Sequence, residues 1–143
     1  MGSAAVARNC AKSFRLPNKA SIFRAELYAI TLAMDLIRSS KDTKFVIFSD
    51  SMLSLEAFNG FKIELDLVQK IIRDITNLIS SGKTIKFCWI PSHVNILGNE
   101  RADTAAKTAL CLPVSSMKLP ACELIPRISK FVLKNGKTSG IMV

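Results

Sequence analysis

Apolar residues recur at helical spacing in two long segments of the chain. Apolar side chains at positions 65, 68, 71, 72, 75, 78 and 79 predict an amphipathic helix over about residues 65–80, which Ser81 and Gly82 end. Ser21 is the expected N-cap of an earlier helix that continues to about Ser39. The pattern therefore places two long helices in the middle of the chain.

Shorter runs rich in β-branched and aromatic residues predict strands between these helices. Residues 43–49 are apolar throughout positions 45–48, which is typical of a strand covered on both faces. Residues 83–90 alternate between polar and apolar and end at Pro91. Near the amino end, residues 3–8 and 12–16 predict a hairpin that turns at Asn9 and Cys10.

Two shorter helices complete the expected order. One spans about residues 51–58 and stops at Asn59-Gly60, and the other spans about 100–110 after Gly98-Asn99. Strands that alternate with helices predict an α/β layered fold with some parallel pairing and an antiparallel edge. A flavodoxin-like domain has the same coarse pattern, but this chain has no glycine-rich phosphate loop.

The length of 143 residues is that of one domain, which we place at residues 1–112. Residues 113–143 lose the periodicity and read as a basic, largely irregular tail, with a helical turn or two near 123–133. No apolar run approaches the roughly 18 residues that span a bilayer, and the amino end has no secretory signal pattern. We therefore expect an intracellular protein, cytoplasmic or nuclear, that is neither secreted nor bound to a membrane.

The net charge and the cysteine content limit which partners and metal cofactors are expected. The net charge of +9 favours polyanionic partners, although on its own it is weak evidence. The four cysteines form no C-x-x-C pair and the chain has one histidine, so a zinc site is not expected. We expect Cys10, Cys88, Cys111 and Cys122 to be reduced thiols that are buried or idle.

Three carboxylates stand where a fold gains little from them. Glu26 shares a helix face with the apolar Ile30 and Ile37, although its place near the helix start also suits the helix dipole. Asp50 directly follows the strand 43–49, at the end where open α/β sheets bind ligands, and could instead cap the next helix. Asp103 is expected in about the first turn of the last helix, where it could simply complement the dipole.

Taken together, the three acids suggest a metal-dependent site. Carboxylate oxygens on one rim of the fold suit Mg²⁺ or Mn²⁺, and two such ions can activate a water and stabilise the leaving oxygen of a phosphodiester. His93, in the loop before the last helix, could then move protons or assist product release. A lone loop histidine is more often an ordinary surface residue.

Three segments resemble the conserved motifs of ribonuclease H domains. Residues 21–30 (SIFRAELYAI) resemble the start of the first helix of that family, and residues 46–51 (VIFSDS) resemble its fourth strand and the acid that follows. Residues 89–103 (WIPSHVNILGNERAD) resemble the histidine loop and the final catalytic helix, and they are the most specific match. The resemblance covers about residues 2–112 and is closest to the domains that follow reverse transcriptase in non-LTR retrotransposons.

This resemblance implies a five-stranded mixed sheet with helices on both faces, and metal-dependent cleavage of the RNA strand of RNA–DNA hybrids. By position, Glu26, Asp50 and Asp103 match three of the four acids that bind two Mg²⁺ or Mn²⁺ ions in the family. His93 matches the histidine of the mobile loop, and Ser51 and Asn99 stand where they could touch nucleic acid. An upstream reverse transcriptase region in a longer polyprotein is a further implied partner.

The chain departs from the family pattern at its amino end. The family has an Asp-Gly-Ser motif at the end of a first, central strand, and this chain begins after the position of that motif, with no acid before Glu26. We expect the missing strand to leave exposed strand edges, unless the hairpin shifts inward or an edge recruits another chain. Without the first aspartate, the rate of cleavage should fall by roughly several orders of magnitude.

Three functions remain open on these grounds. The first is an impaired ribonuclease H-type nuclease of retrotransposon origin, and the second is a non-catalytic module that binds nucleic acid through its basic surface. Binding without cleavage in Mg²⁺ would favour the second. The third is a transposon remnant without a stable fold, which a broad thermal transition would favour.

Overall fold

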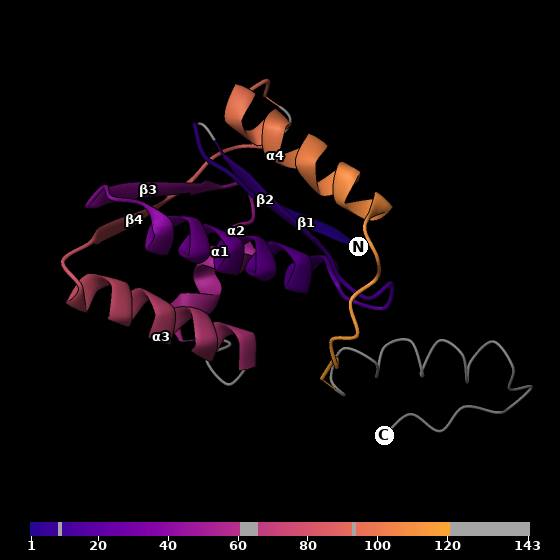
Figure 1. Ribbon diagram of the computed structural model, residues 1–143, viewed down its shortest axis with the longest axis horizontal. Coiled ribbons are helices and arrows are strands. Elements are labelled where there is room, and N and C mark those ends of the chain that lie inside the picture. Colours follow the sequence, from indigo (N-terminus) through magenta and orange to yellow (C-terminus); the bar gives the residue numbers. More distant parts are fainter. Residues whose placement is uncertain (9, 61–65, 93, 121–143) are drawn as a thin grey trace, which may run out of the picture.

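The computed structural model describes residues 1–8, 10–60, 66–92 and 94–120 (Figure 1). The helices of these ranges are α1 (Ile22–Ser39), α2 (Met52–Glu56), α3 (Asp66–Ser80) and α4 (Leu97–Thr108), and 3₁₀ turns follow α2 at Ala57–Asn59 and α4 at Ala109–Cys111. The N-cap predicted for α1 is confirmed, because the Ser21 hydroxyl accepts a hydrogen bond from the Arg24 amide at 3.1 Å.

The strands form two separate pairs rather than one sheet. β1 (Gly2–Val6) pairs antiparallel with β2 (Ala11–Arg15), which confirms the predicted hairpin. β3 (Lys44–Ser49) pairs in parallel with β4 (Thr84–Trp89). Across the described ranges no strand joins the two pairs, and the hairpin has not shifted inward to pair with β3. The predicted α/β class is confirmed, with the described strands in two separate two-stranded sheets.

The main hydrophobic core lies between α1, α3 and one face of the β3–β4 pair. Its most buried side chains include Leu27 and Met34 of α1 and Val68 and Ile71 of α3. These positions follow the helical spacing seen in the sequence, so burial of the two apolar stripes explains why both helices form.

The opposite face of β3 is largely exposed, and this corrects the prediction of a strand buried on both faces. Phe45 and Ile47 pack against the main core, whereas Val46 and Phe48 are 52% and 61% exposed. A continuous apolar run cannot reveal this difference, because both faces carry the same kind of side chain.

The β1–β2 hairpin lies between α1 and α4 (Figure 1). The buried Ser3 hydroxyl donates a hydrogen bond to the Ala25 carbonyl at 2.7 Å, which ties β1 to α1. On the other side Gly2 lies so close to α4 that a Cβ built on it would stand 1.9 Å from the Ala106 carbonyl oxygen. Only glycine leaves room for this contact between strand and helix.

α4 begins about three residues earlier than the sequence indicates, at Leu97 rather than near residue 100. Ile96 occupies the N-cap position without a side-chain hydrogen bond, so the helix start has no polar cap that a sequence pattern could reveal. Asp103 therefore lies in the second turn of the helix rather than the first, where complementing the dipole is a weaker reason for an acid.

The segment after α4 packs on the domain as far as it is described. Residues 113–120 contain no helix or strand, but the Ser115 amide donates to the Arg15 carbonyl at 3.2 Å. Met117 and Leu119 pack against a second, smaller core around Leu16. The last described helical turn ends at Cys111, and the domain boundary at residue 112 stays a prediction. The helical turns expected near 123–133 lie outside the described residues.

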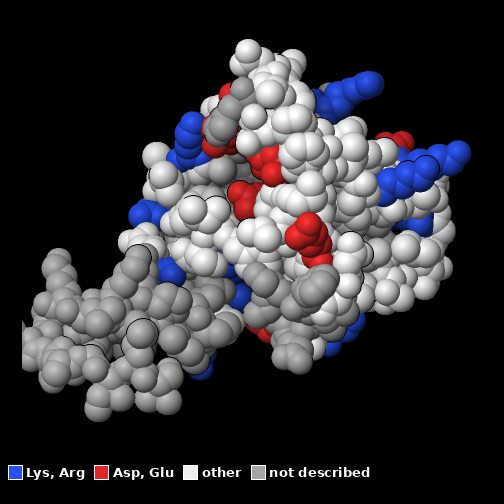
Figure 2. Space-filling model, turned by 180° about the vertical axis from the view of Figure 1, so that it is seen from behind, with Lys and Arg blue, Asp and Glu red and all other residues white. Residues whose placement is uncertain are grey.

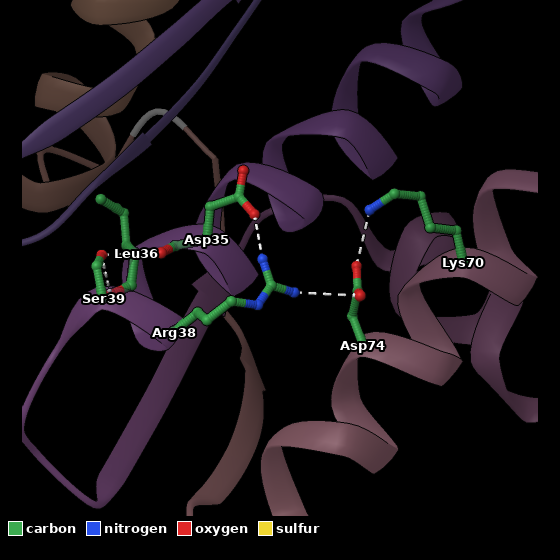
Figure 3. A network of polar contacts seen from close by, with 6 residues as sticks. All are labelled: Asp35, Leu36, Arg38, Ser39, Lys70 and Asp74. Atoms are coloured by element: carbon green, nitrogen blue, oxygen red, sulfur yellow. Dashed lines mark hydrogen bonds and ion pairs between the residues drawn. The ribbon is translucent and has the colours of Figure 1, made fainter.

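A polar network joins the carboxyl end of α1 to α3. Figure 3 shows the Arg38 guanidinium between Asp35, at 2.6 Å, and Asp74 of α3, at 3.2 Å. Lys70 pairs with the same Asp74 carboxylate at 2.8 Å (Figure 3). Surface pairs of this kind each stabilise weakly, so the network adds only modestly to the apolar packing of the two helices.

Three thiols fall within the described ranges, and Cys10, Cys88 and Cys111 are all exposed and outside any disulfide. Cys122 lies outside those ranges. None of the described helices is long and apolar enough to cross a membrane.

Candidate catalytic carboxylate site

Asp50 directly follows β3 and is held by neighbours from two other segments. The Asn99 side-chain amide donates to Asp50 Oδ2 at 3.3 Å, and the Trp89 indole N–H donates to the Asp50 main-chain carbonyl at 3.2 Å. Ser51, not Asp50, occupies the N-cap position of α2. The alternative role for Asp50, as the N-cap of α2, is therefore wrong.

Glu26 lies in the second turn of α1 and faces the other two acids. Its pKa is raised, first because burial disfavours the charged form and then because the carboxylates of Asp50 and Asp103 repel it. Repulsion from both indicates that the three acids share one electrostatic environment. A carboxyl group held at such a cost gains nothing for the fold.

Asp103 comes from α4 and already has a cationic partner. The Lys107 ammonium lies 2.7 Å from Asp103 Oδ2, one helical turn away, and this hydrogen bond raises the pKa of the lysine. Both side chains are largely exposed, so the pair can open at little cost.

The three carboxylates line one small pocket of about 130 Å³ between α1, β1 and α4. Gly2, Asn99 and Glu100 also line it. The acids are near one another without forming a compact set, since no group of three His, Cys, Asp or Glu residues at metal-binding distance occurs within the described part of the chain. Figure 2 shows acidic side chains near the middle of one face, with lysines and arginines mainly around its margin.

The other residues expected at the site have different outcomes. Asn99 lines the pocket and contacts Asp50 directly. Ser51 turns its hydroxyl to Ser54, at 2.7 Å, and does not line the pocket. His93 lies outside the described residues, so its proposed role stays a prediction.

Sequence reasoning missed Lys107 and Trp89 as members of this site. The spacing of Asp103 and Lys107, four residues apart on an expected helix, was a signal that could have revealed their pairing. The contact of Trp89 with the Asp50 carbonyl had no comparable signal, because it joins residues 39 positions apart.

Comparison with known proteins identifies the class to which this fold and site belong. The sequence model of the family described as RNase H matches residues 1–111. The chain belongs to the RNase H family.

The individual relatives share less than 30% of their residues with this chain over the matched region. Ribonuclease H1 of Homo sapiens is 26% identical over 104 residues, which cover 65% of this chain and 36% of the relative. Ribonuclease H1 of Rattus norvegicus is 28% identical over 106 residues, with the same coverage. The matched region thus spans about a third of these relatives. Among solved structures, an N-terminal RNase H domain from Mycobacterium tuberculosis, fused to maltose-binding protein, matches with 18% identity and a TM-score of 0.47, covering 76% of this chain and 89% of that one.

Proposed function

We propose that this chain is a metal-dependent nuclease domain that cleaves the RNA strand of RNA–DNA hybrids, and that it derives from a retrotransposon. The observation that carries the proposal is the pocket lined by Glu26, Asp50 and Asp103 in a chain of the RNase H family. The retrotransposon origin is supported only by resemblance in sequence, which is most specific over residues 89–103.

The chemical type of the donors suits hard divalent cations, although the three acids do not form a compact set in the described part of the chain. Carboxylate oxygens from three elements, with the Asn99 amide beside them, are ligands that suit Mg²⁺ or Mn²⁺. The raised pKa of Glu26 fits as well, since a cation among the three acids would relieve their mutual repulsion. Bound there, such ions would lower the pKa of a water and stabilise charge on the scissile phosphate.

The side chains of this chain would contribute positioning and charge. Asn99 orients the Asp50 carboxylate through its donor hydrogen bond, and Trp89 fixes the main chain on which Asp50 stands. Lys107 pairs with Asp103, and a divalent cation bound by Asp103 would have to compete with this ammonium. Basic side chains around the acidic centre would bind the phosphates of the substrate.

We propose further that the 143 residues alone cleave slowly. Glu26 is the first acid of the sequence, so neither strand of the hairpin adds a carboxylate to the pocket. Three acids without compact spacing bind cations less firmly than a complete set would.

A second candidate is a module that binds hybrid or duplex nucleic acid without cleaving it. The absence of a compact metal-binding group in the described part of the chain favours it, as does the net charge of +9. Phosphate contacts would give such a module strong dependence on salt and little dependence on sequence.

The deciding experiment is cleavage of a fluorescent RNA–DNA hybrid by the purified chain in Mg²⁺ or Mn²⁺, with an EDTA control. An Asp50→Asn variant should lose at least about a hundredfold in rate, the scale of losing one stabilising group in a catalytic site. Glu56→Gln is the matched control, because Glu56 is exposed and does not line the pocket. Circular dichroism confirms that each variant is folded.

The nuclease and the binding module predict different results in this cleavage assay. Cleavage that requires metal and is lost only in Asp50→Asn supports the nuclease. Salt-sensitive binding of the hybrid by a folded chain, without cleavage in either metal, supports the binding module instead.

A further inference from the structure

α4 carries Asp103 and Asn99 of the carboxylate site, but its own side chains hold it only weakly. No residue of Leu97–Thr108 is buried. Apart from Asn99, the partly buried residues of this helix are alanines, at positions 102, 105 and 106. Alanine buries little apolar surface, so these contacts stabilise α4 less than the larger buried side chains stabilise α1 and α3. Contacts outside the helix therefore matter for its position.

Residues 112–120 follow the end of α4 and its 3₁₀ turn, and we call this segment the strap. In Figure 1 it runs from the carboxyl end of α4 past the amino end of the chain. The Arg15 guanidinium donates to the Leu112 carbonyl at 2.9 Å, and the Ser115 amide donates to the Arg15 carbonyl at 3.2 Å. One residue at the end of β2 thus holds the strap at two points.

The strap turns alternate side chains toward the domain. Positions 115, 117 and 119 are partly buried, whereas positions 114, 116 and 118 are exposed. This period of two residues is that of an extended chain with one face covered. Met117 and Leu119 pack against the second core, which includes Leu16 and also Ala25, the residue before Glu26. The strap therefore joins the helix that carries Asp103 to the helix that carries Glu26.

The apolar contacts of the strap must do most of the holding. Two polar atoms of the described residues at this contact, Arg15 Nε and Ser115 Oγ, are buried without a hydrogen-bond partner. Each of them disfavours the packed arrangement, because a buried polar group without a partner has lost its water. Met117 and Leu119 offset this cost, and they supply the large apolar side chains that α4 lacks.

We propose that the strap anchors α4 to the domain and so holds Asp103 and Asn99 at the carboxylate site. The anchor has a polar part, at Arg15, and an apolar part, at Met117 and Leu119. The segment beyond the last helix is then a working part of the domain rather than an irregular tail. Only the consequence for cation binding rests on the proposed function, because the anchoring itself is a property of the fold.

The first test is hydrogen exchange of the full chain that carries both Met117→Ser and Leu119→Ser. The amides of Ala105 and Ala106 in α4 should exchange at least about tenfold faster, because the helix opens locally more often. The amide of Ile71 in α3 should keep its parent rate. Val114→Ser is the matched control, since Val114 is an apolar residue of the strap that is 46% exposed.

A substitution in the hairpin tests the polar part from the other side of the contact. Arg15→Gln removes the donor to the Leu112 carbonyl, so α4 should exchange about threefold faster, the scale of one net hydrogen bond. Lys12→Gln is the control, because Lys12 is exposed on the same strand and its loss changes the net charge equally. The control should leave the exchange of α4 unchanged.

Mn²⁺ binding tests the consequence for the site. The Mn²⁺ concentration that gives half of the maximal thermal shift should rise at least about threefold in the double variant, because α4 then spends less time in place. The same concentration should not change in Val114→Ser.

Three results would overturn the proposal. The first is unchanged exchange of α4 in the double variant, and the second is an equal acceleration of α3 and α4, which would show a general loss of stability. The third is faster exchange of α4 with an unchanged Mn²⁺ dependence, which would remove the role of the strap at the site. A parent chain that binds no Mn²⁺ would contradict the proposed function instead, and hydrogen exchange would still decide whether the strap anchors α4.

Discussion

The Lys107 ammonium lies 2.7 Å from Oδ2 of Asp103, which lines the same pocket as Glu26 and Asp50. One of the three acids is therefore neutralised by a lysine of its own helix. A divalent cation that binds at Asp103 must therefore compete with the Lys107 ammonium for this carboxylate.

Replacing Lys107 with glutamine should tighten Mn²⁺ binding by roughly two- to fivefold, the scale of one exposed ion pair. The measurement is the Mn²⁺ concentration that gives half of the maximal thermal shift. Lys70→Gln is the matched control, since Lys70 forms the same four-residue pair with Asp74, at 2.8 Å, on a different helix. Equal Mn²⁺ dependence of the two variants would show that Lys107 does not compete.

Glu26→Gln should make the protein more stable at neutral pH. The folded-state pKa of Glu26 is raised above 4.5 by burial and by Asp50 and Asp103, so the folded state holds this proton more tightly than the unfolded state. Its contribution to stability is therefore lost as pH rises through the folded pKa, and above that pKa the carboxylate is a net cost.

Thermal unfolding checks this at two pH values. At pH 7 the Tm of Glu26→Gln should exceed that of the parent by a few degrees. At pH 4 the two should agree, because Glu26 is then mostly protonated. A lower Tm for the variant at pH 7 would contradict the repulsion that we assign to the site.

Asp66→Asn should remove a pH-dependent contribution of the opposite sign. The Arg24 guanidinium, which is buried, lies 3.0 Å from Asp66 Oδ2, and its hydrogen bond lowers the pKa of Asp66 below 3.8. The contribution is present above pH 4 and is lost as pH falls through the folded pKa.

Because the Asp66 side chain is 63% exposed, water screens the pair, and we expect a loss of about 1 kcal/mol at pH 7. Urea unfolding at pH 7 and pH 2.5 measures it, and the gap between parent and variant should narrow at the lower pH. Glu56→Gln should show no such change. A gap that stays constant with pH would assign the effect to packing rather than charge.

Gly2→Ala should destabilise the chain by about 1–3 kcal/mol, the usual cost of forcing an extra group into a packed contact. The added Cβ would meet the Ala106 carbonyl at 1.9 Å, so β1 and α4 would have to separate. Gly98→Ala in α4 is the control, since nothing lies within 4 Å of its Cβ position. It should be neutral or up to about 1 kcal/mol more stable. Equal free energies of unfolding for both variants would rule out a close contact at Gly2.

Most elements could be predicted because their signals are local. The apolar stripe of α3, the Ser21 cap of α1 and the turn residues Gly60 and Gly82, both with positive φ, are read within a few neighbouring positions. The start of α4 was placed too late, because Ile96 at the N-cap gives no polar signal. Local chemistry therefore predicts the helices and strands, and fails where an element begins without a cap.

The candidate site was predicted in part. Spacing and resemblance single out Glu26, Asp50 and Asp103, and the structure places all three on one pocket. The partners of these acids were not predictable in the same way, since Trp89 and Asn99 reach Asp50 across long stretches of chain. Such contacts depend on how the helices and strands pack.

The sequence by itself determined which residues form most of the helices and strands, which faces are apolar and which acids contribute little to the stability of the fold. Only the tertiary structure decided that the strands divide into two pairs, that Val46 and Phe48 face away from the core, and that a groove separates β1 from β3. The reason is physical. Periodicity and capping depend on residues within one or two turns, whereas strand pairing and burial depend on which distant edges and faces meet.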